Sequence, residues 1–402
     1  MFKKLKADGT YPIWIIFFFI IISPISLSYK NLNDYSFSVV GGTFDYISTG
    51  YLFTLPISFF FIIPFVILGL RHFKKDLDIF LFSLFILFTC IFSFVFIKDL
   101  SYFVLIAKII TPIFLLLGFE MYFKKKFLNI KKKNFLKIIN NSNRKIALAL
   151  IIVFFISIIN PIYLENKFYW LTDKIAIYDF FQYYPLIFIL LLGVLASNNQ
   201  RYIILLIYLF CFYLSTWSSN LTFYFLLILY GFYHIFSFLI ARKLKNQVIL
   251  SKIVLYLVLI FFIFYPVIVA TFFSEFFNMK IFLGNASITS RLNAIYSFFI
   301  NMSILDFITP FRLDTKISSK FYHNELVVLL STLGIFGTFL FFKIFFKRIF
   351  YISKYFPQIS IAISFVAFLS GIILTPILHP YTSFILCYII SYYFVISKLR
   401  SE

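Results

Sequence analysis

Long apolar runs dominate this chain, and they restrict its fold more than any other feature. A helix needs about 20 consecutive, mostly apolar residues to cross the hydrocarbon core of a bilayer, and such runs recur along almost all of the 402 residues. Only 13% of the residues are charged, whereas soluble domains carry about a quarter. A soluble protein of several domains is therefore excluded. The sequence predicts one polytopic, all-α membrane domain over residues 1–402.

We predict about twelve transmembrane helices. They lie near 11–29, 49–70, 79–97, 100–120, 146–164, 176–196, 202–216, 221–240, 253–273, 324–342, 358–376 and 381–397. The first run is too long for a signal peptide and lacks a small-residue cleavage site, so it is predicted to be an uncleaved span.

The net charge of +21 could point to nucleic acid, so its distribution matters. With the N-terminus inside, the cytoplasmic segments hold 26 of the 36 Lys and Arg residues and only 5 of the 15 Asp and Glu residues. The cytoplasmic side thus carries the whole excess, as the positive-inside rule demands. This distribution predicts a multi-pass inner-membrane protein with both termini in the cytoplasm, and it leaves no basic patch for nucleic acid.

Most of the predicted loops are short, but one is long. Residues 274–323, between the ninth and tenth predicted helices, form a large periplasmic loop with five basic residues, and long loops are usually functional. Apolar residues at helical spacing between Ile288 and Ile300 predict an interfacial amphipathic helix. Arg291 lies near its start, where a guanidinium could bind phosphate oxygens bidentately or simply reach the lipid headgroups.

A second constellation begins the tenth helix. His323 precedes Asn324 at the mouth of an apolar run. The helix dipole disfavours a protonated imidazole there, so a neutral histidine could act as a general base, although a structural histidine is the alternative. Gly334 and Gly337 leave a small-residue surface on which another helix can pack closely.

These residues resemble the C-terminal half of the O-antigen polymerase and O-antigen ligase superfamily, which are GT-C-like membrane glycosyltransferases. The resemblance rests on Ser290-Arg291, the basic loop, His323-Asn324 and Gly334-x-x-Gly337. It covers residues 280–342 in motif and the whole chain in topology.

The sequence departs from the family pattern in two places. Val327 stands where the family often has leucine, which keeps the apolar character. Asn220 stands where a serine-arginine pair often supplies a first cation. That site is therefore in doubt here, and the alternative for Asn220 is a tight turn.

The resemblance implies metal-independent glycosyl transfer at the periplasmic face, without a cofactor, from undecaprenyl-pyrophosphate-linked glycan. Arg291 would hold the donor pyrophosphate, and His323 would deprotonate or orient the acceptor hydroxyl. The further substrate contacts expected at the site are Arg312, Lys320, Asn324 and Tyr322. Expected partners are the lipid-linked oligosaccharide, membrane lipids and a chain-length regulator.

The motifs leave polymerase and ligase open, and we favour the polymerase because its family members are more divergent and richer in Phe and Ile. A lipid-linked oligosaccharide flippase is the alternative from another class. Transporters usually carry ionisable residues within several spans, along with discontinuous helices or repeats. This sequence has mainly Lys108 in mid-span.

Overall fold

The fold is given by a computed structural model. The described residues are 12, 26–28, 54–56, 58–96, 100–128, 139–152, 177–197, 208–209, 221–239, 244–278, 286–301, 324–372, 376–378 and 380–401. Apart from one antiparallel pair of three-residue strands, β1 (Ser26–Ser28) and β2 (Thr54–Pro56), the regular elements in these ranges are helical.

α-Helices form the described body. They are α4 (Ser58–Leu70), α5 (Leu77–Phe96), α6 (Leu100–Phe127), α9 (Ile177–Ser197), α11 (Leu221–Leu239), α12 (Leu244–Asn278), α14 (Ala286–Asn301), α17 (Glu325–Ser353), α18 (Pro357–Ser364) and α19 (Pro380–Ser401). The 3₁₀ turn η1 (Phe73–Lys75) precedes α5, and α18 continues as the π-helix η2 (Phe365–Leu369) and the 3₁₀ turn η3 (Ser370–Ile372). Residues 139–152 are also helical.

Four of the described helices are long and apolar enough to cross a membrane. These segments are Ile106–Phe127, Leu244–Phe272, Glu325–Ser353 and Thr382–Ser401. The chain is therefore a helical membrane protein by the length and composition of its helices. The predicted spans 11–29 and 202–216 lie almost entirely outside the described residues.

Two helices extend beyond the predicted spans, because basic residues lie within helices rather than in loops. α17 continues to Ser353 instead of ending at 342, since Arg348 turns into the protein and is buried there. α12 begins at Leu244 instead of 253, and its Lys252 ammonium lies 5.2 Å from the centre of the Phe350 ring on α17. A lysine stem can cover apolar surface in this way while its charge stays near water.

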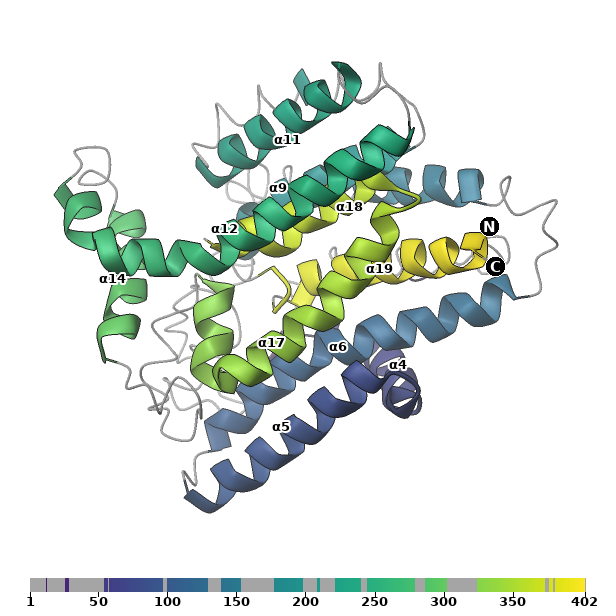
Figure 1. Ribbon diagram of the computed structural model, residues 1–402. Coiled ribbons are helices and arrows are strands. Elements are labelled where there is room, and N and C mark those ends of the chain that lie inside the picture. Colours follow the sequence, from purple (N-terminus) through teal and green to yellow (C-terminus); the bar gives the residue numbers. More distant parts are fainter. Residues whose placement is uncertain are drawn as a thin grey trace, which may run out of the picture.

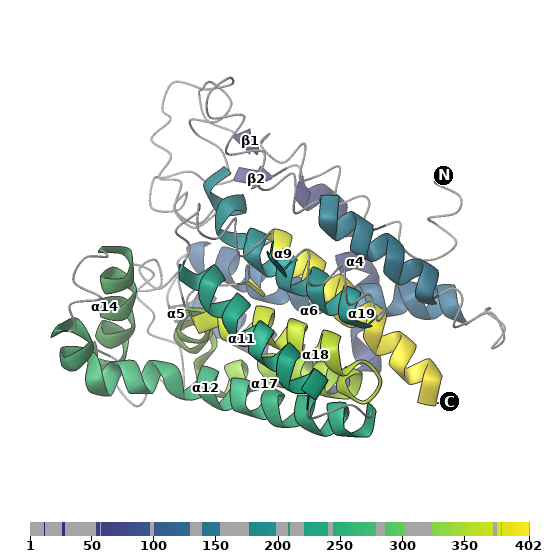
Figure 2. The ribbon, with the colours of Figure 1, turned by 90° about the horizontal axis from the view of Figure 1, so that it is seen from above.

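The long helices lie side by side in a bundle (Figure 1). α6 packs between α4 and α19, while α17 contacts α5, α18 and α19. α12 lies along α17 and α18 and contacts α14, which extends the bundle at one end in both views (Figures 1 and 2).

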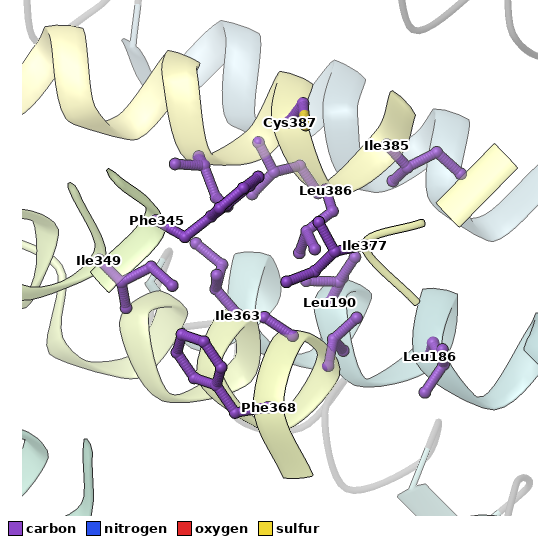
Figure 3. Packing of buried hydrophobic residues seen from close by; sticks show 14 of the residues in the cluster. Leu186, Leu190, Phe345, Ile349, Ile363, Phe368, Ile377, Ile385, Leu386 and Cys387 are labelled. Atoms are coloured by element: carbon purple, nitrogen blue, oxygen red, sulfur yellow. The ribbon is translucent and has the colours of Figure 1, made fainter. Parts of the chain in front are cut away.

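The core lies where α9, α17, α18 and α19 converge. Figure 3 shows Phe345, Ile363, Leu190 and Leu386 from these four helices turned toward one another, and all four are fully buried. The Ser391 hydroxyl of α19 donates to the Leu116 carbonyl of α6 at 2.7 Å. Such hydrogen bonds between helices help to hold membrane bundles together.

Two charge clusters hold α17 against α5 and α6. The buried Arg348 guanidinium pairs with Glu120 of α6 and, through Nη2 at 2.8 Å, with Asp76, which caps α5. Next to it, both oxygens of the buried Asp78 carboxylate accept from lysine ammoniums, Lys343 at 2.8 Å and Lys347 at 2.7 Å. The sequence predicted these residues only as separate cytoplasmic charges.

Gly337 and Gly334 play different parts in α17. A Cβ on Gly337 would lie 2.3 Å from Cε1 of Phe85, so α5 packs closely there, as expected from the sequence. Gly334 instead interrupts the helix with φ 63° and ψ −174°. That backbone region is almost exclusive to glycine, and α17 is sharply bent in Figure 1.

We expect Gly334→Ala to lower the free energy of unfolding by about 1–3 kcal/mol, since any side chain strains this backbone conformation. SDS titration of the detergent-solubilised protein measures this loss. Thr338→Ala is the control, because Thr338 lies in regular helix four residues later and its buried hydroxyl finds no hydrogen-bond partner within the described part of the chain. Equal losses in the two variants would contradict the assigned strain.

Candidate functional site

Asn324 fixes the start of α17. Its extended backbone places Oδ1 to accept from the Val327 N–H at 2.9 Å, which is the usual geometry of an N-cap. Its Nδ2 donates to the Ile372 carbonyl at 3.0 Å. Asn324 therefore both begins the helix and joins it to η3.

Glu325, the first residue of α17, makes the second connection. Its side chain is fully buried, and Oε1 accepts from the backbone N–H groups of Ile377 at 2.8 Å and of Leu378 at 2.9 Å. Among the described residues no donor reaches Oε2. One carboxyl group thus holds the turn 376–378 on the first turn of α17.

Close packing surrounds this carboxyl. A Cβ built on Gly371 would lie 3.2 Å from Oε2 of Glu325 and 2.9 Å from Cε2 of Phe262 on α12. A larger residue at position 371 would therefore push against the side chains of Phe262 and Glu325. The Glu325 carboxyl therefore lies between Gly371 of η3 and the turn 376–378.

The chain facing Glu325 is not regular α-helix. It passes from α18 into π-helix at Phe365–Leu369 and 3₁₀ turn at Ser370–Ile372, and residues 376–378 form a turn. Irregular backbone at membrane depth is tolerated only where the protein satisfies its polar groups. Asn324 and Glu325 supply partners for the Ile372 carbonyl and for the Ile377 and Leu378 N–H groups.

α14 includes the segment that the sequence predicts to be an interfacial helix. Leu292, Ile295 and Phe298 form its buried face, whereas Ile300 is 59% exposed. Arg291 belongs to the second turn of α14, and its side chain lies outside the described part of the structure. In Figure 1, α14 and the first piece of α17 lie toward the same end of the bundle.

The structure therefore places only part of the predicted site. Asn324 is at the N-cap of α17, and the backbone of Arg291 is in α14. The remaining predicted site residues lie outside the described residues; these are His323, Tyr322, Arg312 and Lys320. Asn220 lies outside them as well. The roles assigned to these side chains stay predictions.

Sequence reasoning gave Glu325 no role. The signal was present, since an acidic residue directly after an asparagine cap marks the first turn of a helix. Its partners are 52 and 53 residues away along the chain, so local spacing could not identify them.

The chemistry of the described part of the site is that of positioning. Asn324 and Glu325 form their hydrogen bonds with backbone groups. These bonds fix the start of α17 and the turn 376–378 in place. Within the described residues, no three His, Cys, Asp or Glu side chains come together as metal ligands.

Comparisons with known proteins found nothing similar. No family model, no curated protein and no solved structure matches the chain.

Proposed function

We propose that this protein is a polymerase of surface polysaccharide, such as O-antigen, and a metal-independent membrane glycosyltransferase. It transfers the growing glycan from undecaprenyl pyrophosphate to a new lipid-linked repeat unit at the periplasmic face. The motif resemblance over residues 280–342 supports this proposal. In the same proposal the chain has about twelve spans in the bacterial inner membrane and both termini in the cytoplasm.

The observation that carries the proposal is that hydrogen bonds of Asn324 fix the start of α17. Asn324 directly follows His323 in the sequence and is tied both to its own helix and to Ile372. A general base must stay within hydrogen-bond reach of the proton that it removes. A rigid helix start after His323 suits that requirement.

In the proposed reaction, the acceptor hydroxyl attacks the anomeric carbon while the bond to the pyrophosphate oxygen breaks. His323 takes the hydroxyl proton, and the negative charge of the leaving group collects on the pyrophosphate. Arg291 stabilises this charge, with Arg312 and Lys320 as further cations. Asn324 holds the helix start, and Tyr322 stacks on a sugar ring.

A gel of lipopolysaccharide or capsule tests the proposal. We expect a deletion strain to make core with a single repeat and wild-type protein to restore the ladder. His323→Ala and Arg291→Ala should both fail, because loss of a general base costs about 10²–10⁴ in rate and loss of a group that stabilises the developing negative charge costs about 10²–10³. Lys280→Ala, a change of another loop cation to which no role is assigned, is the matched control at equal expression.

Two results would contradict the proposal. A full ladder from both site variants would remove the assigned catalytic residues. Loss of every repeat-bearing product on deletion would point to the ligase or to a flippase instead of the polymerase.

The flippase is the second candidate, and one structural feature favours it. α17 is interrupted at Gly334, and the run from α18 to η3 changes from α to π to 3₁₀ geometry. Discontinuous helices are typical of the binding sites of transporters. An assay of lipid-linked repeat units in everted vesicles separates the two, since a flippase moves them without lengthening the glycan.

A further inference from the structure

A continuous exposed face runs along α5 and α17. On α5, Leu81, Leu84 and Phe88 recur at helical spacing and are 42%, 46% and 54% exposed. On α17, Phe336 and Phe339 are 57% and 62% exposed. The two helices are in contact along this face.

Ring contacts show that the two exposed stripes adjoin each other. Phe85, one helical turn from both Leu81 and Phe88, lies with its ring centre 5.6 Å from that of Phe336. Phe82 contacts Phe341 at 6.0 Å on the buried side. The face is therefore an apolar surface shared by two antiparallel helices.

Two lysines lie at one end of this apolar surface. Lys343 and Lys347 continue the stripe of Phe336 and Phe339 on α17, and they expose 45% and 61% of their side chains. Both ammoniums bind the two oxygens of one carboxylate, that of Asp78, so they lie close enough together for one phosphate group to bridge them.

The pair keeps a net positive charge. Asp78 lies just before the predicted span 79–97; burial raises the pKa of its carboxyl, but the hydrogen bonds and charges of Lys343 and Lys347 outweigh this and lower it. Asp78 is thus ionised at neutral pH and neutralises one of the two ammoniums. The exposed Lys74 and Lys75, in the turn before α5, add positive charge to the same end of that helix.

We propose that the α5–α17 surface is a binding site for an anionic phospholipid. The phosphate group bridges Lys343 and Lys347, and an acyl chain lies along Leu81, Leu84, Phe88, Phe336 and Phe339. Charge complementarity selects this occupant, because cations at the end of an apolar face match the headgroup and tail of an acidic lipid. The proposal is independent of the proposed enzymatic function.

Native mass spectrometry of the full chain in detergent measures binding of phosphatidylglycerol, with phosphatidylcholine as the neutral comparison. The main variant is D78N with K343Q and K347Q, which removes both lysines without leaving a buried carboxylate unpaired. We expect its affinity for phosphatidylglycerol to fall by about fivefold, because the site loses a net positive charge of one. Asp78→Asn alone should bind phosphatidylglycerol more tightly than wild type, because both ammoniums stay and their counter-charge is gone.

The matched control is K125Q with K245Q, two exposed lysines elsewhere on the chain. This control lowers the net charge by two, whereas the main variant lowers it by one, so general electrostatics predicts the larger loss in the control. A loss in the control equal to or greater than that in the main variant would overturn the proposal. Equal binding of the two lipids by wild type, or displacement of phosphatidylglycerol by inorganic phosphate at equal concentration, would overturn it too.

Discussion

Arg348→Met should lower the free energy of unfolding by about 3–5 kcal/mol, because it leaves two carboxylates without their cation in a low-dielectric site. The wild-type guanidinium is 1% exposed, and Glu120 is 3% exposed. Arg348 also donates through Nη1 to the Ile344 carbonyl at 2.9 Å. Both the charge and the forked shape of the side chain therefore matter, and Arg348→Lys should recover only part of the loss.

A triple variant separates the loss of the Arg348 ion pairs from the cost of leaving their carboxylates unpaired. Arg348→Met combined with Glu120→Leu and Asp76→Asn leaves no charge behind, and asparagine can still cap α5 through its side-chain oxygen. Replacing a buried ion cluster by apolar groups is often close to neutral. We expect the triple variant to be markedly more stable than Arg348→Met alone.

Lys347→Met is the control for this series. It removes a cation from the same helix, one residue away, but the ammonium is largely exposed and Lys343 still pairs with Asp78. Exposed pairs contribute about 0–1 kcal/mol. If Arg348→Met costs no more than Lys347→Met in SDS titration, the buried cluster does not hold α17 to α6.

Glu325→Ala should cost about 2–6 kcal/mol, since two buried backbone N–H groups lose their acceptor and each unmade hydrogen bond costs about 1–3 kcal/mol. The groups belong to Ile377 and Leu378, which are 0% and 5% exposed. Glu325→Gln should retain most of the stability, because its amide oxygen can occupy the place of Oε1.

Two readouts distinguish this role from a general packing effect. Ser331→Ala, which removes a hydroxyl that donates only to its own helix at Val328, should cost less than about 1 kcal/mol. Hydrogen exchange at the Ile377 and Leu378 amides should speed up in Glu325→Ala and stay slow in Glu325→Gln. Unchanged protection in Glu325→Ala would refute the assigned clamp.

Hydropathy alone was enough to predict the membrane class and the approximate places of the long helices. The described helices α5, α9, α11 and α19 start and end within a few residues of the predicted spans, because a bilayer demands an apolar run of set length. The start of α17 was also predictable, since Asn324 before an apolar run is a local cap signal.

Only the tertiary structure decided which polar groups meet. Arg348 pairs with residues 228 and 272 positions away, and Glu325 binds a turn more than 50 residues later. From sequence these were a loop charge and an unassigned acid. Hydropathy reports whether a segment is apolar, but the partner of a buried charge depends on which helices pack together, and that packing is set by contacts between distant parts of the chain.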